Sequence, residues 1–391
     1  MSSKFQKRHV APAIKSKNNQ SSVGSALGQL PTAISLHQKG LFAQAEAIYL
    51  QILNESPNHF DATQLLGTIY AQSKKFELAV QLFSKAIATN PNHIATLNNF
   101  ANALVEIKKF DEAFEYFKKA ISLRPEYAEA HNNLGNAYRA SQKIDLAIAC
   151  FETAIALKPD YIEALHNCGN AYKEQKRFHL AIKCYEQTIK LKPDYEYLYG
   201  LLLFLRMYIC DWDQFGERHV ELIRRIEQGQ KASAPFGVLG MIDSPSIQHM
   251  CSKTYIAHKF PLNPVLGTIP KRPKKNKIRI GYYSADFHSH ATAYLMAEFF
   301  ELHNKDQFEL IAFSFGIDQQ DEMHQRLKKS FDQFIEVQYK TDKEIAVLSR
   351  ELEIDIAVDL KGFTFDGRTD IFSYRAAPIQ VNYLGLSLIH I

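Results

Sequence analysis

Small, aromatic and proline positions recur at one fixed spacing through the first half of this 391-residue chain. The prolines are Pro57, Pro91, Pro125, Pro159 and Pro193, and no insertion interrupts their spacing. The small residues are Gly67, Ala101, Gly135 and Gly169, the alanines are Ala45, Ala79, Ala113, Ala147 and Ala181, and the aromatic residues are Tyr49, Phe83, Phe117, Phe151 and Tyr185. One structural unit is therefore repeated in register.

The period from one proline to the next is typical of tetratricopeptide repeats, in which each unit is a pair of antiparallel helices. Two helices approach closely only where side chains are small, and an aromatic residue four positions after each alanine lies on the same helical face. Proline then ends the second helix. The pattern predicts an α-solenoid over 24–193, with one partial repeat at 24–57 and four full repeats at 58–91, 92–125, 126–159 and 160–193. Such an array is expected to fold by itself.

The second half alternates short apolar runs with helical patterns. We expect strands at 277–283, 308–315, 334–337, 354–360 and 379–384, with helices at 293–303, 322–331 and 342–352. This alternation predicts a parallel sheet covered on both faces. Because ligands of such sheets bind beyond the carboxyl ends of the strands, the loops after Tyr283, Phe315, Leu360 and Leu384 are the expected places for a site.

Residues 194–276 follow neither pattern, and we interpret them as a helical connector and linker. The apolar segment from Tyr197 to Cys210 is interrupted by Arg206 and is too short to cross a membrane, so it is expected to cap the solenoid. The basic run Lys271 to Lys277 is expected to be a solvated interdomain linker, and the alternative is a nuclear address.

Composition and charge argue against a nucleic-acid-binding protein and against an exported protein. The chain is 46% hydrophobic and 23% charged, and its net charge is only +4, without a basic stripe that would indicate a nucleic-acid partner. Five cysteines without a C-x-x-C motif are typical of a reducing compartment. Residues 1–23 are polar, are expected to be disordered and lack an export signal. We therefore expect a cytoplasmic protein without a membrane partner, and its oligomeric state stays open.

Asparagines occupy two positions of the repeat, three residues apart. They are Asn99, Asn133 and Asn167 in one column and Asn102, Asn136 and Asn170 in the other. Spacing of three places both columns on one helical face. Each amide offers two donors and an acceptor, so the columns can bind the backbone of an extended peptide. The alternative is that they are ordinary solvated surface residues.

The loop Ser284 to His290 follows the first predicted strand and precedes a helix. A group in this position, here His290, can handle a proton or an anion near a substrate. Its alternative is a merely exposed histidine. A metal site is not expected, because the His-x-His pair has no cysteine or acidic cluster to complete it. The chain contains no G-x-G-x-x-G, Walker or G-x-S-x-G motif, so no dinucleotide, P-loop or α/β-hydrolase chemistry is indicated.

Three segments together resemble the amino-terminal catalytic half of the O-linked N-acetylglucosamine transferase (SPINDLY-like) family. They are Ile278 to Phe287, Ile354 to Thr364 and Arg375 to Gly385. The preceding repeats, the Cys210-Asp211-Trp212 segment and Pro235-Phe236 are similar to that family's layout too. The resemblance covers about residues 24–385.

The resemblance implies a GT-B glycosyltransferase in which two Rossmann-like lobes close over a nucleotide sugar and a serine or threonine of a protein acceptor. The implied donor is UDP-N-acetylglucosamine, and no cofactor or metal is implied. His290 falls on the family's active-site histidine, although Ala291 stands where the family commonly has proline. The asparagine columns resemble the ladder on the concave surface of the family's repeats.

The family continues after Leu384-Gly385 with an aromatic residue, Pro, Gly and Thr, whereas residues 386–391 resemble translated adapter sequence. We therefore expect an incomplete lobe at 277–385, a non-native tail, and a chain that lacks the donor-binding lobe and is inactive by itself. Two alternatives stay open. One is a tetratricopeptide adaptor with a structural α/β portion, and the other is a protein O-fucosyltransferase that uses GDP-fucose.

Overall fold

The computed structural model describes residues 26–273, 275–317, 319–364 and 366–383. It forms two compact units, which divide between Arg177 and Phe178. The predicted disordered N-terminus, the predicted tail at 386–391 and the loop after Leu384 lie outside the described residues.

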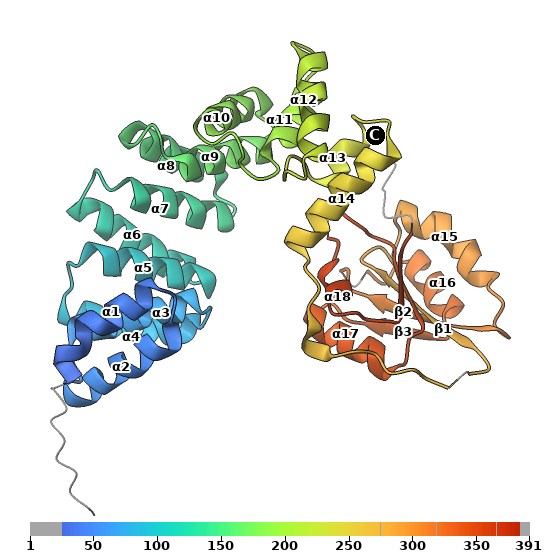
Figure 1. Ribbon diagram of the computed structural model, residues 1–391, viewed down its shortest axis with the longest axis horizontal. Helices are drawn as coiled ribbons and strands as arrows, with labels where there is room; N and C mark the ends of the chain where they lie inside the picture. The colour runs from blue at the N-terminus through green and yellow to red at the C-terminus, as the bar shows by residue number, and fades with distance from the viewer. Residues whose placement is uncertain (1–25, 274, 318, 365, 384–391) are drawn as a thin grey trace, which may run out of the picture. The chain divides into compact units, whose positions relative to one another are not determined.

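The first unit is a stack of antiparallel helix pairs (Figure 1). Its elements are η1 Ala26–Gln29, α1 Leu30–Gln38, α2 Phe42–Glu55, α3 Phe60–Gln72, α4 Phe76–Thr89, α5 Ile94–Glu106, α6 Phe110–Leu123, α7 Ala128–Ala140, α8 Ile144–Leu157 and α9 Ile162–Glu174. The prediction of a tetratricopeptide array is confirmed. The segment predicted as a partial first repeat contains both helices of a pair, α1 and α2.

The columns of small and aromatic residues meet inside each pair. A Cβ atom added to Gly67 would lie 2.9 Å from the ring of Phe83, and one added to Gly135 would lie 2.6 Å from the ring of Phe151. Both rings are fully buried. The close contact of α3 with α4 and of α7 with α8 therefore depends on the missing side chain.

The turn inside each helix pair contains a residue with a left-handed backbone, which the sequence pattern does not predict. Gly40, Lys74, Lys108, Gln142 and Lys176 occupy the same position of successive repeats, and all have a positive φ, between 58° and 75°. The residue after each one donates its N–H to the helix that has just ended, as Lys75 does to the carbonyl of Tyr70 at 2.8 Å. This left-handed ending favours glycine, yet only the first turn has one.

The second unit begins with helices and continues into a sheet. The helices before the sheet are α10 Phe178–Leu191, α11 Leu198–Tyr208, α12 Phe215–Glu227, α13 Pro235–Leu239, α14 Pro245–Lys259 and η2 Pro264–Leu266. Arg206 of α11 is buried and forms ion pairs with Glu186 of α10 and with Asp211. The acidic residue of the Cys210-Asp211-Trp212 segment thus compensates the charge of a buried guanidinium.

Five parallel strands form the sheet, in the order β3-β2-β1-β4-β5. The strands are β1 Ile278–Ser284, β2 Phe308–Ser314, β3 Gln333–Glu336, β4 Ile356–Asp359 and β5 Ile379–Asn382. The helices are α15 Ala291–Glu301, α16 Glu322–Ser330, α17 Asp342–Glu351 and α18 Asp370–Ser373. The predicted α/β region is confirmed, with the short helix α18 added.

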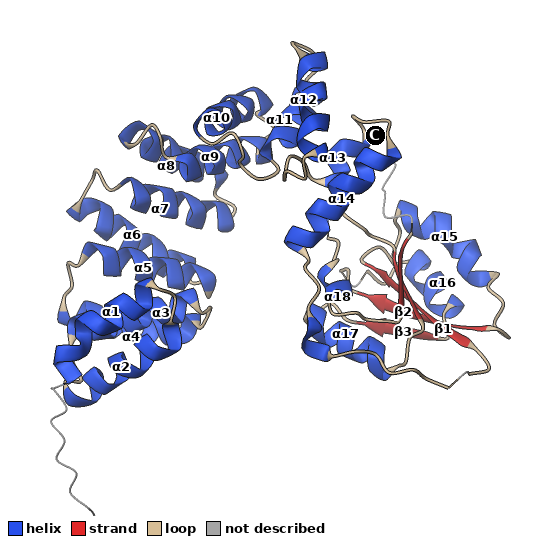
Figure 2. Cartoon of the chain, in the orientation of Figure 1, coloured by secondary structure: helices blue, strands red, loops and turns tan. Residues whose placement is uncertain are grey.

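Helices lie on both sides of the sheet (Figure 2). Alternate residues of β1 point to opposite faces, as a strand requires. Tyr282 packs with Met296 of α15 and Leu327 of α16 in one core, whereas Tyr283 packs with Ile345 of α17 and Ile371 of α18 in the other. The two cores explain why the central strands read as continuous apolar runs.

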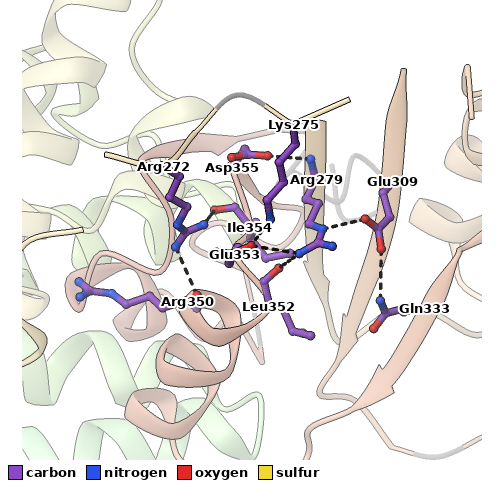
Figure 3. Close-up of polar contacts among 10 residues, drawn as sticks. All are labelled: Arg272, Lys275, Arg279, Glu309, Gln333, Arg350, Leu352, Glu353, Ile354 and Asp355. Atoms are coloured by element: carbon purple, nitrogen blue, oxygen red, sulfur yellow. Dashed lines mark hydrogen bonds and ion pairs between the residues drawn. The ribbon is translucent and has the colours of Figure 1, made fainter. Parts of the chain in front are cut away.

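The basic linker before β1 is held by the lobe rather than solvated throughout (Figure 3). Arg272 donates to the carbonyls of Arg350 at 3.2 Å and Ile354 at 3.5 Å, and Lys275 forms an ion pair with Glu353. Arg279 donates to the carbonyl of Leu352 at 2.9 Å. Arg272 and Arg279 thus donate to carbonyl groups in and just after the last turn of α17, where the helix dipole favours cations.

Candidate active site and peptide groove

A cleft of about 790 Å³ opens at the carboxyl ends of the parallel strands. Four consecutive strand-end loops line it, those after β1, β2, β3 and β4. The lining residues are Ala285, Asp286, His288, Phe315, Gly316, Ile317, Gln338, Tyr339, Asp366, Gly367 and Arg368. The loops after Tyr283, Phe315 and Leu360, where the sequence predicts a site, therefore surround one cavity.

The loops after β1 and β2 touch each other at the cleft. A Cβ atom on Gly316 would lie 1.9 Å from the carbonyl oxygen of Ala285, so no larger residue fits there without a backbone shift. The backbone of the β1 loop is also held by α16, because His324 Nδ1 contacts the carbonyl of Phe287 at 3.0 Å. The amide of Ser289 donates to Asp321 at 2.7 Å.

Asp321 serves two segments at once. Besides Ser289, its carboxylate accepts the amide of His324 at 2.8 Å, which makes it the N-cap of α16. These backbone donors keep the pKa of Asp321 below its usual value. The β1 loop is thus tied to the start of α16 by a carboxylate that stays ionised.

His290 is the N-cap residue of α15 and has an extended backbone. Its Nδ1 accepts the amide of Thr292 at 3.2 Å and lies 3.5 Å from Asp286 Oδ2. The first contact requires a bare Nδ1 and the second requires a protonated one, so they select opposite tautomers of the neutral ring. His290 follows the cleft-lining His288 by two residues and is not itself among the residues that line the cavity.

A buried ion pair joins two of the loops. Lys361 Nζ, after β4, donates to both oxygens of Asp286, after β1, at 3.0 and 2.9 Å, and both side chains are only 9% exposed. The sequence reasoning missed this pair. The two residues are 75 positions apart, so no local spacing links them, and the only signal was their place after adjacent predicted strands.

Asp359 organises the end of β4. Its Oδ1 accepts the amides of Lys361 at 2.9 Å and Gly362 at 3.0 Å, and its Oδ2 accepts the Asn382 side chain of β5 at 3.2 Å. Burial raises the pKa of Asp359, and these donors partly oppose that rise. The turn that presents Lys361 to Asp286 is therefore built on a second carboxylate.

Four of the predicted peptide-binding asparagines line one hollow of the first unit. Asn99, Asn102, Asn133 and Asn136 share a groove of about 440 Å³ with side chains of α3, including Thr68 and Gln72. The face that the sequence predicts is therefore concave here and carries amides. The other two, Asn167 and Asn170, lie on α9, outside the lining of this groove.

A further column, one residue before the first, ties neighbouring repeats together. Asn133 donates to Asn98 at 3.2 Å, and Asn167 donates to Asn132 at 3.0 Å. The sequence reasoning did not single out Asn98 and Asn132, although they too are exactly one repeat apart. The Asn133 oxygen also accepts from the Asn132 side chain at 3.4 Å, so a peptide backbone would use the N–H groups and lone pairs that these bonds leave over.

The described residues contain neither a cluster of metal ligands nor a membrane-spanning helix. No group of three or more His, Cys, Asp and Glu side chains could hold a metal ion within them. No helix in the described ranges is both long and apolar enough to cross a membrane.

The amide groove lies in a stack of helical repeats, and the strand-end cleft lies in a parallel α/β lobe. Residues 246–388 match the profile of glycosyl transferase family 41. Profiles described as TPR repeat and tetratricopeptide repeat match 101–141, 135–176 and 162–195. Residues 38–120 match the profile of anaphase-promoting complex, cyclosome, subunit 3.

Named relatives point the same way. A probable UDP-N-acetylglucosamine–peptide N-acetylglucosaminyltransferase of Arabidopsis thaliana is 28% identical over 192 residues, which is 45% of this chain and 20% of that protein. The corresponding transferase of Caenorhabditis elegans is 29% identical over 110 residues, 28% of this chain and 10% of that protein. The chain thus spans a fifth or less of these relatives.

A solved Thermobaculum terrenum O-GlcNAc transferase mutant aligns with 75% of this chain and 51% of its own, at 22% identity and a TM-score of 0.43. Residues 246–388 thus match glycosyl transferase family 41, and tetratricopeptide repeats precede this region, as expected for a distant relative of the O-linked N-acetylglucosamine transferases.

Proposed function

We propose that this chain is part of a protein O-glycosyltransferase that transfers N-acetylglucosamine from UDP-N-acetylglucosamine to serine or threonine of protein acceptors. The observation that carries the proposal is the strand-end cleft within the family 41 region, because its lining residue Asp286 contacts both His290 and Lys361. The choice of donor rests on the names of the relatives. We also propose a cytoplasmic location, because the cysteines show no C-x-x-C motif and residues 1–23 are polar.

In this proposal the repeats hold the acceptor. The groove lined by Asn99, Asn102, Asn133 and Asn136 offers amides at a regular spacing and has no requirement for particular peptide side chains. It suits an extended backbone whose serine or threonine varies in context. A tetratricopeptide adaptor without transfer activity would use the same groove, and therefore peptide binding alone does not separate the two functions.

His290 is proposed to handle a proton at the acceptor hydroxyl. To accept that proton on Nε2, the ring needs its own proton on Nδ1, facing Asp286 Oδ2 at 3.5 Å. The N-cap contact with Thr292 favours the other tautomer. Asp286 is thus a positioning residue, and Lys361, which binds both its oxygens, sets how strongly it draws the Nδ1 proton.

The test is a transfer assay on the protein encoded by the complete reading frame. Purified protein is incubated with a Ser/Thr peptide and either UDP-N-acetylglucosamine or GDP-fucose, and modified peptide is measured by mass spectrometry. We expect mass gain with the first donor. A mass gain with GDP-fucose alone would show that the protein is an O-fucosyltransferase. Peptide binding without a mass gain from either donor would instead support the adaptor function.

A further inference from the structure

Basic side chains gather on the asparagine face of the repeats, beyond the groove already described. Arg139 of α7 and Lys173 of α9 occupy the same position of successive repeats, and each follows an asparagine of the second column, Asn136 or Asn170, by three residues. Residues three apart share a helical face. His166 of α9 lies on that face too, with Asn170 Nδ2 in contact with its ring at 3.4 Å.

The positive charges of this cluster are only weakly compensated. Arg139 Nε is 3.9 Å from Glu174, a carboxylate whose side chain is 43% exposed. Arg139 Nη1 is buried and has no hydrogen-bond partner within the described residues. A buried guanidinium N–H without an acceptor is costly, and an incoming acceptor would remove that cost.

The side chains of Arg139, His166 and Lys173 also interact electrostatically. The pKa of His166 falls to about 4, first because of burial and then because of Arg139 and Lys173. Burial lowers the pKa of Lys173, and Arg139 adds to the decrease, whereas Glu174 opposes it. At neutral pH the His166 imidazole is therefore uncharged and can form hydrogen bonds beside Arg139 and Lys173.

We propose that Arg139, His166 and Lys173 form a recognition site for an Asp or Glu side chain of an extended peptide bound along the asparagine columns. A carboxylate is planar and has two oxygens, which matches the fork of donors of a guanidinium. The proposal rests on the proposed function in one respect, namely that the repeats bind peptide acceptors. It adds a preference, an acidic residue at a fixed distance from the backbone held by the asparagines.

The experiment measures peptide affinity by calorimetry with the 391-residue chain. The peptides are Ser/Thr-containing, acetylated and amidated so that no terminal charge remains, and a single Glu is scanned through them against Gln at the same position. At one or more positions we expect Glu to bind about tenfold more tightly than Gln, the gain typical of a charge-assisted hydrogen bond.

The variant Arg139→Gln/Lys173→Gln should bind the Glu and Gln peptides equally, with unchanged helical circular dichroism. Its matched control is Arg124→Gln/Lys158→Gln. Arg124 and Lys158 also occupy one position of successive repeats, and both are exposed. They lie over the rings of Tyr127 and Tyr161, so the control removes the same two charges away from the proposed site. The control should keep the preference for Glu.

Three results would overturn the inference. They are equal binding of every Glu and Gln pair by the unmodified chain, a preference that survives in Arg139→Gln/Lys173→Gln, and a preference that appears only when phosphoserine replaces Glu. If no peptide binds at all, the peptide-binding part of the proposed function fails and the inference falls with it. If the unmodified chain binds Glu and Gln peptides equally and Asn99→Ala/Asn133→Ala no longer binds either, the inference alone fails and peptide binding by the asparagines stands.

Discussion

Single residues in the repeats are constrained mainly by the space their neighbours leave. The glycine column is the clearest case, because Gly135 has the Phe151 ring where a side chain would stand. Ala101 occupies the same repeat position and is fully buried in one core with Phe117, so a methyl group is accepted there. Each position of the repeat pattern thus records a steric limit, and that is why the sequence alone predicts the array.

Gly135→Val should destabilise the repeats by about 1–3 kcal/mol, as expected for overpacking of a close helix contact. Gly135→Ala should cost less, because Ala101 already occupies the equivalent position. The measurement is urea unfolding followed by helical circular dichroism. Equal stability of Gly135→Val and the unmodified chain would show that α7 and α8 can separate without loss.

His166 gives the repeats a pH dependence. Its folded pKa is about 4 against an ordinary value of 6.5, because it is half-buried beside Arg139 and Lys173. Between these two pH values the unfolded chain binds a proton that the folded chain does not, so stability is lost as pH falls from about 6.5 to about 4.

The variant His166→Asn should show a smaller decrease in melting temperature between pH 7 and pH 5 than the unmodified chain. Comparing the two proteins cancels the contributions of all other titrating groups. If both lose the same number of degrees, His166 is not held in the neutral form by the folded repeats.

At the scale of helices and strands, the sequence predicts most elements but few of the contacts between them. The predicted strand 277–283 is β1 Ile278–Ser284, and the predicted helix 342–352 is α17 Asp342–Glu351. Alternation of apolar runs is a local property, and therefore it is visible along the chain. The Asp286–Lys361 pair and the contacts of Arg272 and Arg279 with the end of α17 join distant segments, and no local pattern encodes them. The left-handed Lys74 and Lys108 were equally hidden, since lysine does not favour that conformation.

Lys361→Met should destabilise the lobe by about 3–5 kcal/mol, because it leaves the Asp286 carboxylate buried without its cation. The double variant Asp286→Asn/Lys361→Met should lose less than Lys361→Met alone, since no uncompensated charge remains. Hydrogen exchange of β1 and β4 measures this directly, for instance at the Leu360 amide that donates to Tyr283 at 3.0 Å. A double variant that exchanges faster than the single one would contradict the ion-pair account.

At the scale of the whole molecule, helical repeats and an α/β region share one chain. The repeats present amides along a groove, and the family 41 region has a cleft at the ends of its parallel strands. Fold class and family could be predicted from the sequence because both depend on patterns that extend over many residues. The roles of individual side chains could not, because they depend on tautomers, loop contacts and charges that only the folded chain brings together.

The central claim is that the lobe performs the transfer and the repeats hold the acceptor, and one kinetic comparison in the complete protein tests it. His290→Ala should lower kcat by about 10²-fold or more, as expected for a positioned acid or base, with little change in peptide Kd. Asn99→Ala/Asn133→Ala/Asn167→Ala should instead raise the KM for the peptide and leave kcat nearly unchanged. A normal kcat in His290→Ala, or an unchanged KM in the asparagine variant, would contradict the corresponding half of the account.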